Sequence, residues 1–214
     1  VMEHGAMKER YTRRMTFNER AFVAFNLICP PTINQFIFDG GGTLDPERWR
    51  KAAEVASEAN PGTRLILKGH LGWSRWADSG IAPRVREMDG STWDGMAPEN
   101  APLLQEPLPY RESPTCEIIL IQGPIPRVVF RSHHGVCDGR GTLFWAEEVF
   151  RVLRGEPLIG SNANITDVEL CRSFQNQYRT PFPTEHIAPT GRAKGNDTGV
   201  TWRRRSIKGK VPNL

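Results

Sequence analysis

Two apolar runs that lie close together in the chain constrain its fold most strongly. The segments "EIILIQ" (117–122) and "RVVFRS" (127–132) are joined only by "GPIP". Short apolar runs bounded by glycine and proline are typical of strands. Val128, Val129 and Phe130 are consecutive, which indicates a strand buried on both faces. We therefore expect two neighbouring strands with a short connection.

A second unit precedes this pair. Residues 33–38 are rich in β-formers and are followed by a glycine turn. Asp45 before Pro46 predicts a helix start, because a carboxylate caps the helix and proline fits its first turn. Residues at helical spacing then share one face: Trp49, Ala52, Ala53 and Ala56. The stop signal "NPG" and a strand over 64–67 complete an expected β-α-β unit.

The remaining segments are read from the same kinds of signal. Residues 80–114 are rich in proline and acids and are expected to be mostly irregular surface. Residues 142–155 predict an amphipathic helix ending at Gly155, ahead of Pro157. Further along, residues 179–198 have the composition of a linker, and residues 199–214 begin what could be another strand.

Composition limits the class of protein. The 214 residues are 38% hydrophobic with a net charge of +4, which is typical of a globular chain and does not demand an anionic partner. The cysteines form no CxxC pair and are expected to be reduced thiols: Cys29, Cys116, Cys137 and Cys171. Neither a secretory signal nor an apolar run of membrane-spanning length is visible. We expect a soluble cytoplasmic protein that binds neither membrane nor nucleic acid.

The predicted strand at 127–132 is followed by "HHGVCDG", which holds two of the five histidines. Successive side chains of a strand point to opposite faces, so His133 and His134 should separate, one toward the core and one toward a cavity. A neutral imidazole in a cavity could accept and return a proton at cytosolic pH. The pattern alone favours a structural role for both rings.

The same residues, and two other segments, are compatible with other chemistries. Zinc would need both imidazoles to converge with Cys137 and Asp138, and a strand end is poorly suited to that. Cys137 could be a thiolate nucleophile beside His134. The stretch "DGGGTLD" lacks the spacing of a phosphate-binding loop and is expected to be a turn. The run "WRRRSIKGK" could bind nucleic acid or an acidic carrier protein, but a solvated charge run is favoured.

The full string HHxxxDG resembles the signature of the condensation-domain and chloramphenicol-acetyltransferase-like superfamily. The order of elements over roughly residues 17–157 is also similar, and "TWRRRSI" resembles the strand that opens the second half of such proteins. The resemblance implies an α/β fold: a mixed β-sheet covered by helices in a two-layer sandwich, one of the two lobes of the full fold. It divides the chain into an N-terminal lobe (1–178), a linker (179–198) and the truncated start of a second lobe (199–214).

The resemblance also implies roles for individual residues. His134 would be catalytic, acting as general base on the acceptor or orienting it, and His133 would be its inward structural partner. Asp138 would form a structural ion pair with an arginine, for which Arg64 is at the matching place. Gly139 would let the backbone turn closely into the helix. No metal or tightly bound cofactor is implied.

The implied activity is acyl transfer from a pantetheine thioester, on a carrier protein or coenzyme A, to an amine or hydroxyl, as in nonribosomal peptide or natural-product synthesis. The sequence departs from the family pattern where "ANPGTRL" replaces "RHExLRT", and it supplies one lobe. The expected partners are therefore a carrier protein or coenzyme A and a missing C-terminal lobe or second chain. An exposed lobe interface could drive homodimerisation. A non-catalytic lobe that binds a carrier protein or partner lobe remains the alternative.

Overall fold

The computed structural model describes residues 11–95, 99–161, 169 and 172–173. The predicted linker at 179–198, the predicted second-lobe start at 199–214 and Cys171 lie outside these described residues. In the described part of the chain, no helix is both long and apolar enough to cross a membrane.

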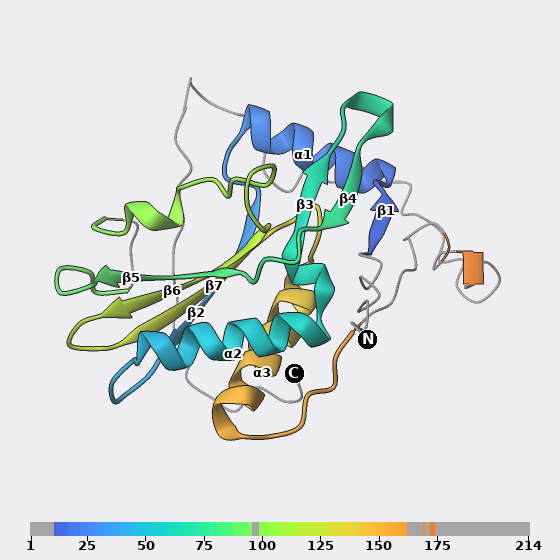
Figure 1. Cartoon of the computed structure of the whole chain (residues 1–214). Helices are drawn as coiled ribbons and strands as arrows, with labels where there is room; N and C mark the ends of the chain where they lie inside the picture. Colours follow the sequence, from blue (N-terminus) through green and yellow to red (C-terminus); the bar gives the residue numbers. More distant parts are fainter. Residues whose placement is uncertain (1–10, 96–98, 162–168, 170–171, 174–214) are drawn as a thin grey trace, which may run out of the picture.

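Strands and helices are interspersed along the described part of the chain (Figure 1). The helices, including three short 3-10 turns, are α1 (Phe17–Ile28), α2 (Pro46–Ala59), η1 (Pro61–Arg64), η2 (Leu71–Trp73), η3 (Pro102–Leu104) and α3 (Gly139–Arg154). The strands are β1 (Thr12–Arg14), β2 (Ile33–Asp39), β3 (Leu65–Lys68), β4 (Arg75–Asp78), β5 (Arg84–Asp89), β6 (Cys116–Gln122) and β7 (Arg127–His133).

The larger sheet is mixed, as predicted. Its order is β2-β7-β6-β5, in which β7 is antiparallel to both neighbours and β5 is parallel to β6. The predicted strand pair is confirmed as the β6–β7 hairpin, with Ile119 opposite Val129. Every residue of β7 is buried, as the run of consecutive apolar residues indicated.

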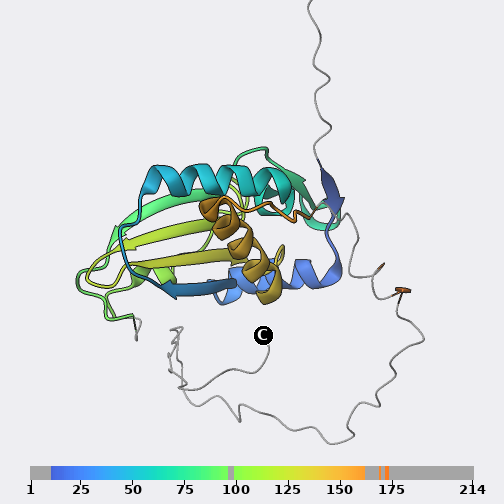
Figure 2. The same ribbon diagram turned by 90° about the horizontal axis from the view of Figure 1, so that it is seen from below.

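Helices α2 and α3 lie side by side over one face of this sheet (Figure 2). Helix α2 begins and ends where the sequence predicted, whereas α3 ends as predicted but begins at Gly139, three residues before the predicted start, because Asp138 caps it. Asp45 caps α2 by accepting the backbone N–H groups of Glu47 and Arg48, and Gly155 ends α3 in the left-handed conformation at φ 73°. The main core lies between these helices and the sheet, where Ala53, Ala56 and Val149 are fully buried.

The opposite face of the sheet is covered by the segment predicted to be irregular surface. This interpretation of residues 80–114 was wrong in two respects. The segment contains β5, and its apolar side chains form a second core cluster against the sheet: Trp93, Ala101, Leu103 and Leu104. Composition misled because proline-rich loops can still bury the apolar residues between their turns.

The expected β-α-β unit is also corrected. Strand β3 follows α2 as predicted, but it belongs to a separate antiparallel sheet of order β1-β4-β3. Leu65 pairs with Asp78 and Lys68 with Arg75 in this smaller sheet, which lies beside one end of the larger one (Figure 1).

Helix α1 was not predicted. It begins with a capping box, in which the Thr16 hydroxyl accepts the backbone N–H of Glu19 while the Glu19 carboxylate accepts the backbone N–H of Thr16 at 2.7 Å. Several of its apolar side chains are exposed, so the hydrophobic periodicity of a buried helix is absent. The capping spacing in "TFNE" was the signal that could have revealed it.

A buried cluster of charges lies on the face of the larger sheet away from α2 and α3. Glu117 and Arg131 are opposite each other on β6 and β7, are 2% and 0% exposed, and form an ion pair. Arg84 donates to the Glu117 carboxylate at 2.8 Å, and Arg86 approaches it at 3.4 Å. Burial acts to raise the pKa of Glu117, but the bond from Arg84 and the charges of Arg131 and Arg86 outweigh it and lower the pKa.

We predict that Glu117→Gln lowers the free energy of unfolding at pH 7 by about 3–5 kcal/mol, because it leaves the Arg131 guanidinium buried without its counter-charge. Denaturant unfolding measures this loss. Since the folded pKa of Glu117 is lowered, its contribution is present above the unfolded pKa and is lost as pH falls through the folded value. Glu87→Gln, in the half-exposed pair with Arg50, is the control and should cost under about 1 kcal/mol. Equal, small losses in both variants would contradict the prediction.

Candidate functional site

The two histidines separate at the end of β7, as the alternation of a strand predicted. His133 is the last residue of the strand and is 0% exposed, whereas His134 is half-buried in the turn that follows. The main chain on both sides of this point is held, since the His133 N–H donates to the Thr115 carbonyl at 2.8 Å and the His134 N–H to the Thr32 carbonyl at 3.1 Å.

The His133 ring is enclosed by the fold. Its Nδ1 accepts the backbone N–H of Gly135 at 3.0 Å, so the neutral ring carries its proton on Nε2. The ring packs edge-on against Tyr110, with centroids 5.1 Å apart, and lies near Trp76. Burial, and then the neighbouring His134, lowers the pKa of His133 to about 4. His133 is therefore uncharged at neutral pH, and its ring has no exposed surface.

His134 meets a different environment. Its ring stacks on Phe22 of α1, with centroids 4.1 Å apart and planes 6° from parallel. Within the part of the chain that the structure describes, its Nδ1 atom is buried and has no hydrogen-bond partner. Phe22 fixes the plane of the imidazole, and sequence reasoning missed it because α1 itself was not predicted.

Asp138 and Arg64 do not form the predicted ion pair. Asp138 is exposed and caps α3, accepting the backbone N–H of Gly141 at 2.7 Å. Arg64 instead clasps both carboxylate oxygens of Asp78, with Nε at 3.0 Å from Oδ1. The smaller sheet explains this choice, since the pairing of Leu65 with Asp78 places Asp78 beside Arg64.

Gly139 is not the glycine that the turn most requires. A Cβ atom there would meet only Phe36, at an ordinary contact distance of 3.7 Å. At Gly141 a Cβ would lie 2.7 Å from the Cys137 sulfur, and at Gly135 it would lie 3.1 Å from the His133 Nδ1. The close approaches in this loop therefore fall at Gly135 and Gly141.

The thiolate alternative at Cys137 is not supported. Burial raises the pKa of Cys137 to about 11, with hydrogen bonds from Thr142 and Ser132 only partly opposing it. The thiol therefore stays protonated at neutral pH. Cys29, Cys116 and Cys137 form no disulfide among the described residues, and no group of three or more metal-ligating side chains gathers in that part of the chain.

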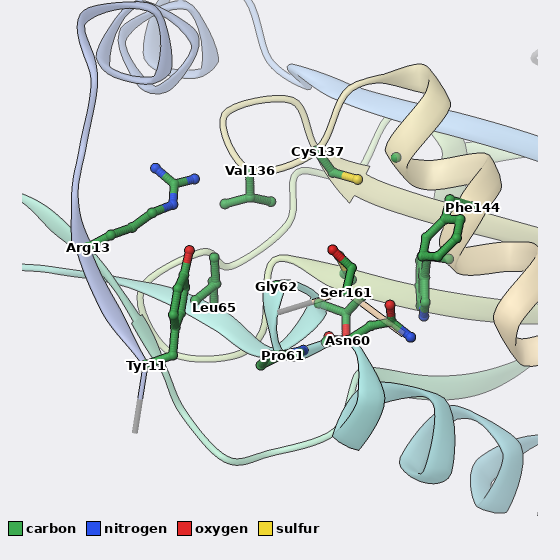
Figure 3. Close-up of a pocket in the computed structure, with 14 residues that line it drawn as sticks. Tyr11, Arg13, Asn60, Pro61, Gly62, Leu65, Val136, Cys137, Phe144 and Ser161 are labelled. Carbon is green, nitrogen blue, oxygen red and sulfur yellow. Dashed lines mark hydrogen bonds between the residues drawn. The ribbon is translucent and has the colours of Figure 1, made fainter. Parts of the chain in front are cut away.

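A cavity of about 220 Å³ lies beside the motif loop (Figure 3). Val136 and Cys137 of the loop and Gly141 of α3 form one wall, and Asn60 and Pro61, where α2 gives way to η1, contribute another. Arg13 of β1 and Tyr11, the residue before that strand, also line it. No sequence signal pointed to this cavity, because its walls come from segments far apart in the chain.

The fold matches solved structures, although no family model and no curated protein matches the sequence. The condensation domain of the Monacolin K polyketide synthase MokA is 14% identical with a TM-score of 0.60, and the match covers 77% of this chain and 40% of that one. The starter condensation domain of rhizomide synthetase RzmA is 18% identical (TM-score 0.55; 77% and 43% covered). An epimerization domain of tyrocidine synthetase B is 13% identical (TM-score 0.58; 78% and 41% covered).

We predict that His133 makes stability pH-dependent. Its pKa is 6.5 when unperturbed and about 4 when folded, so between these values the unfolded state binds more protons. The free energy of unfolding should therefore rise with pH across this window and level off above it. The rise in the free energy of unfolding that His133 causes across this window amounts to about 3 kcal/mol. Denaturant unfolding at pH 4.5 and 7 should show a larger change for wild type than for His133→Phe, and equal changes would refute the assignment.

The chain spans about two-fifths of the length of these condensation and epimerization domains. The predicted architecture, a mixed sheet covered by helices, is present. The resemblance to the condensation-domain superfamily is therefore confirmed at the level of the fold: this chain has the fold of part of a condensation domain of the chloramphenicol-acetyltransferase-like type.

Proposed function

We propose that this chain is the catalytic-motif lobe of a condensation-type acyltransferase, with His134 as its general base. The observation that carries the proposal is the difference in burial and surroundings between the two histidines at the end of β7. His133 is buried and held neutral, while His134 lies in the turn just before α3, stacked on Phe22. This arrangement occurs in a chain with the fold of condensation domains.

In the proposed reaction His134 takes a proton from an amine or hydroxyl acceptor. The freed lone pair attacks the carbonyl carbon of an acyl thioester, forming a C–N or C–O bond. The C–S bond then breaks, and the pantetheine thiolate that leaves takes up the proton from the imidazolium. The donor would be carried by phosphopantetheine on a carrier protein or by coenzyme A. Proton transfer by a positioned imidazole contributes about 10²–10⁴-fold to such reactions.

We further propose that α1 carries part of the surface that a complementary lobe covers. Phe17, Leu27 and Ile28 are 83%, 74% and 79% exposed, and Trp73 of the neighbouring η2 is 84% exposed. Arg20 of α1 donates to the Gly72 carbonyl at 3.1 Å, so the first half of α1 lies next to η2. Large apolar side chains exposed on one helix and its neighbour favour an interaction site. The match covers 40% of the MokA condensation domain. The partner that we propose is a second lobe, equivalent to the part of that domain which this chain does not match.

We expect His134→Ala to lower the rate of acyl transfer at least about 10²-fold while leaving the thermal unfolding temperature close to that of wild type. The assay follows transfer from acyl-pantetheine and acyl-coenzyme A thioesters to amines and alcohols. It is run with the full chain alone and fused to the C-terminal lobe of a condensation domain. His70→Ala, at an exposed histidine outside the motif, is the matched control. If no transfer occurs in either form, the non-catalytic binding lobe becomes the better interpretation.

The α1 surface predicts self-association when no partner lobe is present. Sedimentation velocity of the full chain should show a concentration-dependent dimer. The variant with Leu27→Glu and Ile28→Glu should remain monomeric, with an unchanged unfolding temperature because both side chains are already exposed. A wild-type chain that stays monomeric at high concentration would count against this surface.

A further inference from the structure

The cavity beside the motif loop has a polar part that the proposed chemistry at His134 does not use. Trp145 of α3 and Asn60 at the end of α2 both line it, and they are only 1% and 4% exposed. In the described part of the chain, Trp145 Nε1 and Asn60 Oδ1 are buried without a hydrogen-bond partner. Two residues that line one cavity therefore each keep a buried polar atom unsatisfied, which costs free energy that a ligand bonded to those atoms would recover.

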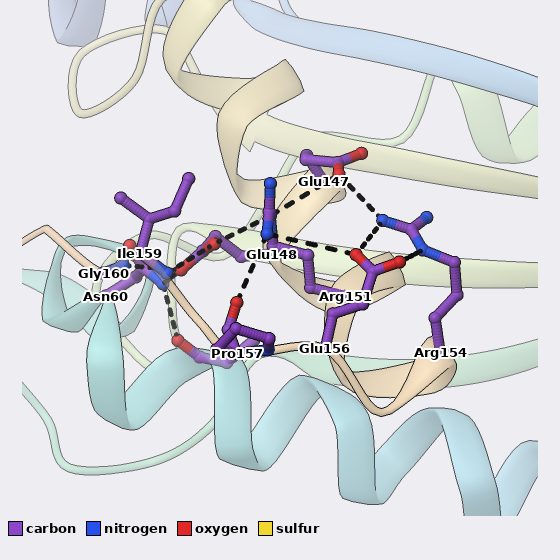
Figure 4. A network of polar contacts seen from close by, with 10 residues as sticks. Asn60, Glu147, Glu148, Arg151, Arg154, Glu156, Pro157, Ile159 and Gly160 are labelled. Atoms are coloured by element: carbon purple, nitrogen blue, oxygen red, sulfur yellow. Dashed lines mark hydrogen bonds and ion pairs between the residues drawn. The ribbon is translucent and has the colours of Figure 1, made fainter.

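The Asn60 oxygen is held in this orientation by its surroundings. The Asn60 Nδ2 group donates to the Ala56 carbonyl at 2.9 Å and to Glu148 Oε2 at 3.1 Å. Both partners can only accept, since the Glu148 carboxylate also takes the backbone N–H groups of Gly160 at 2.7 Å and Ile159 at 3.1 Å (Figure 4). Flipping the amide would bring oxygen against oxygen on both sides, so Oδ1 stays on the unbonded side.

The other walls indicate a neutral ligand with an apolar part. Leu65, Val136 and Phe144 contribute apolar surface (Figure 3). The cation at the cavity, Arg13, is already paired with Glu19 at 2.5 Å, so its charge is compensated. A carboxylate or phosphate would therefore find no uncommitted charge there, whereas a neutral group with one donor and one acceptor would satisfy both buried atoms.

We propose that this cavity binds a secondary amide. Its carbonyl oxygen accepts the indole N–H of Trp145, and its N–H donates to Asn60 Oδ1. A secondary amide occurs both in the pantetheine arm and in a peptide unit. The choice of the pantetheine arm and a peptide unit as sources of the amide rests on the proposed acyl transfer. The inference that Trp145 and Asn60 bind an amide does not rest on it. The cavity adjoins the loop that carries His134, so a thioester arm or a peptidyl group held there would enter next to the motif.

The test follows the indole N–H signal of Trp145 in ¹⁵N-labelled full chain, assigned with Trp145→Phe. The chain is titrated with pantetheine and, separately, with N-acetyl-leucine methylamide; isoamyl acetate, an ester with a branched apolar chain and a carbonyl but no amide N–H, is the ligand control. We expect at least one of the two amides to shift this signal saturably, and the tighter one identifies the source. Because Trp145→Phe removes this signal, the affinities of the variants are measured by isothermal titration calorimetry; Trp145→Phe should weaken binding of that amide about tenfold, the effect of one lost hydrogen bond.

Trp76→Phe is the matched variant, because Trp76 also has a buried indole N–H without a partner among the described residues but lies outside the cavity. It should change the affinity less than twofold. Phe144→Trp, at a half-buried position of the cavity wall, should block binding by filling the cavity. This variant tests the proposal if Trp145→Phe fails to fold. No shift with either amide, or binding that Trp145→Phe and Phe144→Trp leave intact, would overturn the proposal.

His134→Ala separates this inference from the proposed function. His134 does not line the cavity, so the variant should bind the amide as wild type does. Amide binding without any acyl transfer would overturn the catalytic proposal alone. Acyl transfer without amide binding would overturn the amide site alone.

Discussion

Strand β7 is the constraint on which the rest of the structure depends. It is hydrogen-bonded on both sides and buried at every position, so its register cannot slip without moving charged residues into the apolar core. One set of alternate residues faces α2 and α3, and the other set carries Arg131 and His133 to the opposite face. The end of this strand therefore decides which histidine is buried and which one enters the turn.

Buried polar groups join elements that are distant in the chain. Arg131 and Glu117 link β7 to β6, while Glu148 joins α3 to the end of α2 through Asn60 and to the backbone after α3. Such groups are stable in an interior only when their bonds are complete. Among the described residues, Asn60 and Trp145 each keep an unsatisfied buried atom and both line the cavity beside the motif loop, which is why we infer a ligand there.

The site also depends on α1, which is only partly buried. Phe22 on its inner side holds the plane of the His134 ring, while Leu27 and Ile28 face outward. A partner packed on the outer side would stabilise the same helix that positions the imidazole. In our proposal, assembly with a second lobe and the positioning of His134 are therefore coupled through one helix.

Local chemistry was enough to predict much of this protein. The apolar runs of β6 and β7, the Asp45 cap of α2 and the Gly155 end of α3 rest on residues within a few positions of each other, so the sequence alone determined them. The tertiary structure decided the rest: that Arg64 pairs with Asp78 and not Asp138, that β3 joins a separate sheet, and that Phe22 stacks on His134. These outcomes depend on which distant segments meet, and an arginine or an aromatic ring has several acceptable partners until packing chooses one.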